Sequence, residues 1–163
     1  MYAKFLRLLP LLIVIGMMSS MSFAQDKEEV LAKGKYLVTV GGCNDCHTAA
    51  YPESGGKVAE SDWLKGSPIG YQGPWGTSYA ANLRLAASSM TEEQFMARSR
   101  SELLPPMPWF NLRVMSDADL VAIYQYIKSL GNPGQAAPTY VPPGAVPITP
   151  FVVFVPQEAP SGR

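Results

Sequence analysis

Two cysteines and the only histidine of the 163-residue chain stand within five consecutive residues, Cys43-Asn44-Asp45-Cys46-His47. A disulfide between the cysteines would enclose only Asn44 and Asp45, and so small a loop removes little entropy from the unfolded chain. A structural zinc site needs four ligands, and the sequence has only these three thiol and imidazole groups. A thioredoxin-like redox pair would need a preceding strand and a βαβ pattern, which the flanking residues do not show.

The five-residue string is instead the attachment signature of a c-type haem. Two thiols at this spacing can add to the two vinyl groups of one porphyrin, and the next residue can place its imidazole beneath the iron. The sequence therefore predicts haem c bound covalently to Cys43 and Cys46, with His47 as an iron ligand. The string occurs once in the sequence, so one haem is expected.

The first 24 residues have the composition of a secretory signal. Lys4 and Arg7 precede an apolar stretch, Leu8 to Met18, and small side chains at Ser22 and Ala24 suit a signal peptidase. An uncleaved membrane anchor is the rival interpretation, but a bilayer needs roughly 20 apolar residues and this run is about half that length. We expect residues 1–24 to be removed, leaving a soluble periplasmic protein without a membrane span.

The chain is nearly neutral, with 13 basic and 13 acidic side chains. Loss of Lys4 and Arg7 with the signal would leave 11 basic groups against 13 acidic ones, a formal charge of −2. No run of Lys or Arg occurs, so nucleic-acid binding is not expected. The small charge also argues against strong electrostatic steering, and we expect redox partner proteins to dock on an apolar patch around the haem edge.

A methionine between prolines is the predicted ligand on the second face of the iron. Pro105, Pro106 and Pro108 surround Met107, fix the backbone on both sides and prevent a helix through it. The alternative is a proline-rich turn with a core methionine at its tip. Three other methionines remain after signal cleavage but are explained by packing in or beside helices: Met90, Met96 and Met115.

Hydrophobic periodicity predicts three helices. The first covers residues 26–40 and carries Gly34 on its apolar face, where a second helix could approach closely. The second runs from Thr91 towards Ser101 with capping-box spacing, and the third follows Ser116 and closes at Gly131. Residues 51–87 show no period and are predicted to be a loop over the porphyrin.

The last segment, residues 132–163, is predicted to be a non-helical extension because it holds eight of the 15 prolines. The apolar run Phe151 to Val155 within it is too short to cross a membrane. We expect this run to lie against the haem domain or against a partner subunit.

Together these motifs resemble class I cytochromes c with one haem. The string GGCNDCHT at residues 41–48 is similar to the family's attachment site, PMP at 106–108 to its methionine loop, and residues 119–130 to its C-terminal helix. The segment GTSYAANL at 76–83 resembles one in cytochrome c subunits of periplasmic alcohol and aldehyde dehydrogenases. The resemblance covers residues 27–131.

The resemblance implies an all-α fold, with about three main helices and long loops around the haem, for a haem domain over residues 25–131. It places Gly34 opposite an aromatic face around Tyr124, and Tyr79, Asn82 and Arg84 near the haem propionates. The alternative for these last three is that Tyr79 packs, Asn82 turns the chain and Arg84 is solvated.

The predicted function is that of a one-electron carrier, not an enzyme, between a dehydrogenase and the respiratory chain. A haem enzyme or gas-binding protein with an open sixth iron position is the alternative, and a haem that only supports folding is a third hypothesis.

Overall fold

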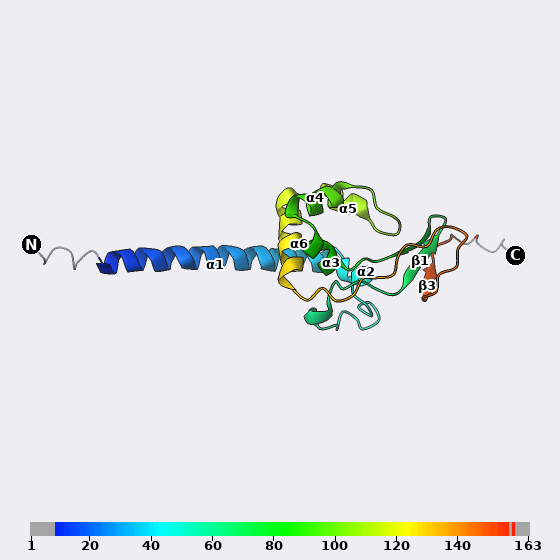
Figure 1. Cartoon of the computed structure of the whole chain (residues 1–163), viewed down its shortest axis with the longest axis horizontal. Coiled ribbons are helices and arrows are strands. Elements are labelled where there is room, and N and C mark those ends of the chain that lie inside the picture. Colours follow the sequence, from blue (N-terminus) through cyan, green and yellow to red (C-terminus); the bar gives the residue numbers. More distant parts are fainter. Residues whose placement is uncertain (1–8, 157, 159–163) are drawn as a thin grey trace, which may run out of the picture.

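The computed structural model describes residues 9–156 and 158 (Figure 1). Within this part the chain is mainly helical, as predicted, and a small sheet is added to the helices. The helices are α1 Leu9–Val40, α2 Cys43–His47, α3 Leu83–Ser89, α4 Glu92–Arg100, α5 Trp109–Val114 and α6 Asp117–Ser129. The strands are β1 Gly70–Gly73, β2 Gly76–Tyr79 and β3 Phe151–Val153, and a single 3-10 turn covers Glu60–Asp62.

The crossing of α1 and α6 forms the centre of the core. A Cβ atom added at Gly34 would collide with the backbone oxygen of Ala122 and would lie 2.6 Å from the Cβ atom of Tyr126. The predicted close approach at Gly34 is therefore confirmed, because only a residue without a side chain fits there. The predicted neighbour was wrong: Gly34 faces Ala122 and Tyr126, while the ring of Tyr124 packs 5.3 Å from that of Phe95.

Helix α1 begins earlier than the sequence analysis placed it. Instead of starting at Asp26, it runs from Leu9 to Val40 without interruption. The sequence has no proline between residues 11 and 40, so nothing breaks the ladder of backbone hydrogen bonds. Within the part of the chain that the structure describes, no helix is both long and apolar enough to cross a bilayer.

Both later helices begin where their capping residues predicted. The hydroxyl of Thr91 accepts from the Gln94 backbone N–H, and the side chain of Gln94 accepts from the Thr91 backbone N–H. Ser116 and Asp119 form the same two bonds at the start of α6. The apolar stripe of α6 faces the core, and its buried members are Leu120, Ala122, Ile123, Tyr124, Tyr126 and Ile127. These caps satisfy backbone donors that a helix start leaves open.

The three-stranded sheet was not predicted. Strands β1 and β2 form an antiparallel hairpin, and β3 pairs parallel to β1 with Gly70 opposite Phe151. Each strand has only three or four residues, and the hairpin strands are rich in glycine, so no alternating apolar pattern marks them. An all-α fold is therefore incomplete as a description of this chain.

The segment after α6 is non-helical as predicted and packs on the haem domain. Thr77 and Val141 exchange two backbone hydrogen bonds of 2.7 and 2.9 Å, and the hydroxyl of Tyr79 lies 2.8 Å from that of Thr149. Figure 1 shows the segment returning past β1 to form β3 at the opposite end of the domain from α6. Of the two expected locations for Phe151 to Val155, contact with the haem domain is the one that the structure shows.

Candidate functional site

Helix α2 presents the two thiols and the imidazole on one face. Cys43, Cys46 and His47 occupy positions i, i+3 and i+4 of a single helical stretch, which lie side by side on a helix surface. Gly42 precedes them with a φ of 68°, in the left-handed region that glycine adopts without strain. Both cysteines are free thiols. The helix therefore places all three side chains where a single bound group could contact them.

The imidazole of His47 is buried and held in one orientation. Its Nδ1 lies 2.7 Å from the backbone oxygen of Ala81. A carbonyl oxygen only accepts, so Nδ1 carries the hydrogen and Nε2 keeps its lone pair. Burial lowers the pKa of His47, although the bond to Ala81 acts in the opposite direction. Among the described residues Nε2 has no hydrogen-bond partner, which is the state that iron ligation requires.

The loop over residues 60–67 forms hydrogen bonds with α2 and with Thr48, the residue after it. The hydroxyl of Thr48 donates to Asn44 Oδ1 and accepts from the backbone N–H of Leu64, both at 2.7 Å. The backbone N–H of Gly66 donates to the oxygen of His47 at 2.8 Å. Asn44 and Thr48 are almost completely buried, so these bonds fix the helix firmly.

The surroundings of the thiols are buried, and one further side chain, Tyr71, contributes to them. Burial raises the pKa of Cys43 to about 11. The pKa of Tyr71, on β1, is also raised, first by burial and then by its neighbour Cys46. Tyr71 is a site residue that the sequence analysis missed, because one aromatic side chain in an aperiodic segment carries no signal of its own. The sequence analysis also missed Ala81 as the hydrogen-bond partner of His47, because every residue type has a backbone oxygen.

Met107 lies in a non-helical turn before α5, as its proline neighbours predicted. Its backbone N–H donates to Leu104 and its oxygen accepts from Trp109, at 3.2 and 2.9 Å. The hydroxyl of Ser78 donates to the backbone oxygen of Pro105 and so joins this turn to β2. Met96 and Met115 pack against the hydrophobic core, which agrees with their predicted packing role. Met90 caps the end of α3.

Tyr79 and Asn82 are bonded within the protein. Tyr79 meets Thr149 of the C-terminal segment. The side chain of Asn82 accepts from the N–H of Leu85 at 2.9 Å and caps α3, and its amide donates to the backbone oxygens of Pro133 and Gln135. These contacts hold the C-terminal segment beside α3. The expected role of both residues near haem propionates stays a prediction.

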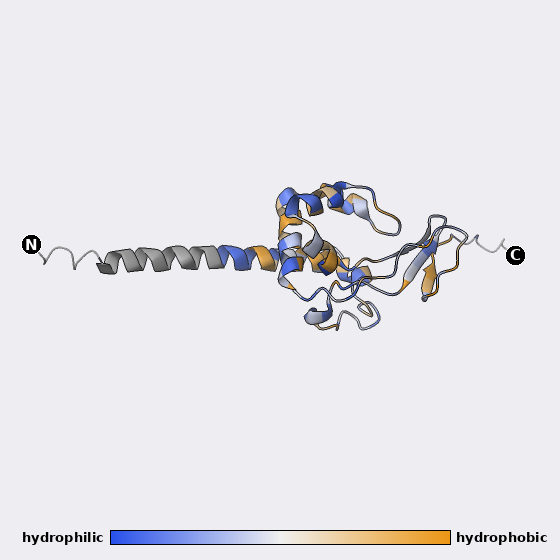
Figure 2. Ribbon diagram, viewed as in Figure 1, coloured by the Kyte–Doolittle hydropathy of each residue, from blue (hydrophilic) through white to orange (hydrophobic). Residues whose placement is uncertain are grey.

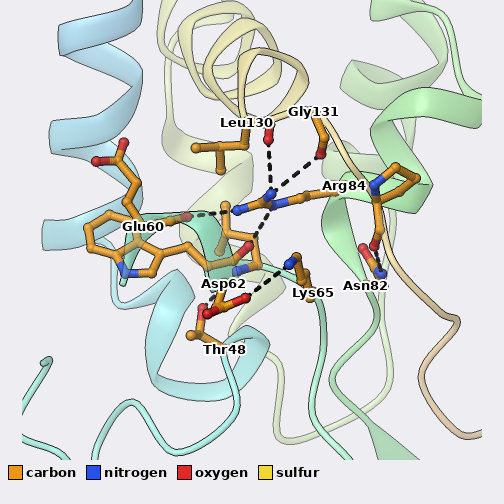
Figure 3. Close-up of polar contacts among 11 residues, drawn as sticks. Thr48, Glu60, Asp62, Lys65, Asn82, Arg84, Leu130 and Gly131 are labelled. Carbon is orange, nitrogen blue, oxygen red and sulfur yellow. Dashed lines mark hydrogen bonds and ion pairs between the residues drawn. The ribbon is translucent and has the colours of Figure 1, made fainter. Parts of the chain in front are cut away.

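Arg84 is 3% exposed, so the solvated alternative for this residue is wrong. Its guanidinium donates to four backbone oxygens, as Figure 3 shows for the contacts around Glu60, Leu130 and Gly131. The distances are 2.7 Å to Trp63, 2.8 Å to Glu60, 2.9 Å to Leu130 and 3.4 Å to Gly131. Contact between Arg84 and a propionate also stays a prediction.

The residues present fit a covalently bound haem. Cys43 and Cys46 are unpaired thiols, and the lone pair of His47 on the same face of α2 is oriented by Ala81. Thioether bonds and one imidazole ligand require this donor set. With a single such set in the sequence, the site corresponds to one haem c.

Comparison with known proteins agrees with this chemistry. The family model for cytochrome c matches residues 31–131. A nicotinate dehydrogenase subunit of Pseudomonas putida is 28% identical over 120 residues, which cover 67% of this chain and 9% of that protein. The gluconate 2-dehydrogenase cytochrome c subunit of Pantoea cypripedii is 26% identical over 129 residues, covering 71% of this chain and 27% of that subunit. The chain thus spans less than a third of the length of either relative. No solved structure matches it.

Proposed function

The chain belongs to the cytochrome c family, and on that premise we propose that it is a one-electron carrier with His47 and Met107 on the two faces of its haem iron. Bound haem c supplies a ferric/ferrous couple, and a thioether ligand raises its reduction potential. The protein's part is to hold both ligands through the change of charge. With both iron positions filled by the chain, no substrate needs to bind the metal.

The observation that carries this proposal is the way β2 and its continuation join the two ligand-bearing segments. The hydroxyl of Ser78 binds the Met107 turn at Pro105, and three residues later the oxygen of Ala81 binds the His47 imidazole. One short piece of backbone therefore positions the segments that carry both proposed ligands. Such a rigid link limits ligand movement between the two redox states, which favours rapid electron transfer.

We propose further that the donor is a periplasmic dehydrogenase and that residues 1–24 are a cleaved export signal. Two relatives are subunits of dehydrogenases, one acting on nicotinate and one on gluconate. The carrier would accept one electron at a time from such an enzyme and pass it towards the respiratory chain. Export suits the chemistry, because haem c attachment and the signal-like composition of the first 24 residues point to the same compartment.

Replacement of Met107 by Ala tests the proposed ligand set. Cys43, Cys46 and His47 still hold the haem, so the variant should keep its covalent cofactor. It should lose any near-infrared sulfur-to-iron absorption of the ferric form, have a lower potential, and bind carbon monoxide in the ferrous form.

Met96→Leu is the matched control, because Met96 packs against the core and its replacement should leave the spectrum unchanged. If Met107→Ala kept the parent spectrum and did not bind carbon monoxide, Met107 would not be the ligand. The same substitution at Met90 and Met115 would then identify the ligand, and failure of all three would favour the gas-binding alternative.

A further inference from the structure

Strand β3 and the residue after it expose a continuous run of apolar side chains. Phe151, Val152, Val153 and Phe154 are between 41% and 55% exposed, although each is large and apolar. Figure 2 shows this strand as one of the most hydrophobic elements at its end of the domain. Contiguous exposed apolar surface of this kind is characteristic of interaction sites in soluble proteins.

The outer edge of β3 has no neighbouring strand in the described part of the chain and could pair with one. In the described part of the chain, β3 has only β1 as a neighbour. Backbone bonds of 2.9 Å from Gly70 to Pro150 and 2.6 Å from Phe154 to Gln72 fix its inner edge. Because ladder bonds alternate along a strand, the backbone groups of Phe151 and Val153 point away from β1. A strand that adds here would pair with these backbone groups.

The segment that contains this edge carries no charge. Residues 129–157 contain no Asp, Glu, Lys, Arg or His. Natural proteins usually place charged side chains or twists on exposed edge strands to prevent pairing with other chains. A pocket of about 300 Å³ lies beside the strand, and its lining, which includes Gln72, Pro74, Pro142 and Val155, has no charged side chain. The surface therefore suits a neutral, apolar occupant.

The residue after β3 contacts an aromatic side chain near the haem attachment site. The rings of Phe154 and Tyr71 meet edge to face with 5.8 Å between their centroids. Cys46 contributes to the raised pKa of Tyr71, so these two side chains are neighbours. The side chains of Phe154 and Tyr71 therefore connect β3 with the surroundings of Cys46, which offers an electron a route from a docked protein to the haem attachment site.

We propose that the outer edge of β3 docks a neutral, apolar strand of the dehydrogenase subunit that reduces this cytochrome. The proposal rests on the proposed function, which supplies the donor. On docking, one electron leaves the reduced redox centre of the dehydrogenase and converts the ferric haem to the ferrous form. An anionic membrane is the less suitable occupant, because membrane-surface segments carry Lys or Arg and this one has neither.

The test uses the full-length holoprotein with Val153→Lys, which puts a charge on the edge at a side chain that is 55% exposed. Val40→Lys is the matched control, because Val40 is 60% exposed and ends α1. Haem reduction is followed by stopped flow with the substrate-reduced dehydrogenase complex isolated from the source organism. We expect Val153→Lys to slow the reduction at least tenfold while its spectrum and potential stay unchanged, and Val40→Lys to behave as wild type.

A second variant and a crosslink separate the possible outcomes. Val153→Thr keeps the strand tendency and should slow reduction less than Val153→Lys. A photo-crosslinking side chain at position 153 should link to a strand of the dehydrogenase, and the same side chain at position 40 should not. Wild-type rates for Val153→Lys, or a crosslink only to a second copy or to lipid, would overturn the docking proposal and leave the carrier function standing. If the dehydrogenase failed to reduce even the wild-type haem, the proposed donor would be wrong. If, in addition, position 153 formed no crosslink to any redox protein, the proposed docking surface would be wrong too.

Discussion

At the scale of single residues, Arg84 is a buried cation that faces backbone oxygens. Among the described residues it has no carboxylate within ion-pair distance, and its donors join the 60–67 loop to the end of α6. The last carbonyls of a helix carry partial negative charge, so Leu130 and Gly131 are favourable partners for a cation. Burial lowers the pKa of Arg84, while Tyr126 and the nearby carboxylates Asp62 and Glu60 act against that shift. The loop that Arg84 holds is the one that supports α2.

Replacing Arg84 with Met should destabilise the holoprotein by roughly 3 kcal/mol, because buried carbonyl groups would lose their donors. Arg84→Lys should recover only part of the loss, since an ammonium lacks the planar fork that reaches several oxygens at once. Chemical denaturation followed by circular dichroism measures both. Arg98→Met, at an exposed position of α4, serves as the control and should change stability by less than about 0.5 kcal/mol. Equal stability of Arg84→Met and wild type would contradict the role given to Arg84.

At the scale of elements, the start of α6 is held to α1 by a charged side chain. Asp119 completes the capping box with Ser116 and forms an ion pair of 2.7 Å with Lys33. The bond from Lys33 and then that from Ser116 lower the pKa of Asp119 from 3.8 to about 2. A carboxyl group with a lowered pKa stabilises the fold above its ordinary pKa, and the contribution is lost as pH falls from about 4 to about 2.

The stability difference between wild type and Asp119→Asn should therefore depend on pH. Wild type should melt at the higher temperature at pH 5 and above, and the two melting curves should converge between pH 4 and pH 2. Lys33→Gln should reduce the wild-type advantage in the same pH range, because it removes the first cause of the shift. Thermal melts across this range give the answer. A constant difference down to pH 2 would show that the ionised carboxylate is not what stabilises the start of α6.

Elements whose signal is local were predictable from the sequence. The caps at Thr91 and Ser116 each depend on residues within one turn of the chain. The apolar face that carries Gly34 is likewise a pattern within one helix, whereas the residues that Gly34 meets, Ala122 and Tyr126, lie far away in the sequence. Strand β3 was not predictable, because it forms only by pairing with β1, about 80 residues away in the sequence, and its neighbours are glycine-rich. In the candidate site, Cys43, Cys46 and His47 could be predicted from the attachment string. The hydrogen-bond acceptor for His47 could not, because it is the backbone oxygen of Ala81, which every residue type has.

At the scale of the whole molecule, the C-terminal segment is part of the haem domain. It bonds to Asn82 beside α3, to Thr77 on β2 and to β1 through β3. The hydroxyl of Tyr140 also donates to the backbone oxygen of Trp75 at 2.7 Å. These contacts cover the hairpin whose continuation carries Ala81, so the segment stabilises the surroundings of the haem.

Limited proteolysis should find this segment protected. Chymotrypsin prefers aromatic residues, and we expect cleavage at Tyr140 in the native holoprotein to be much slower than in urea, because backbone bonds between Val141 and Thr77 must open first. Mass spectrometry of the fragments over time measures the rate. Rapid removal of the segment with an unchanged haem spectrum would show that it does not contribute to the domain.

The central claim is that the chain itself supplies both axial ligands of one covalent haem and thereby carries electrons. Exposure of the dithionite-reduced wild-type holoprotein to carbon monoxide tests it most directly, because the gas competes for the iron position assigned to Met107. The account predicts that the visible spectrum stays that of the reduced protein under saturating gas. Formation of a carbon monoxide complex with wild type would contradict it and would identify the iron as open to small molecules.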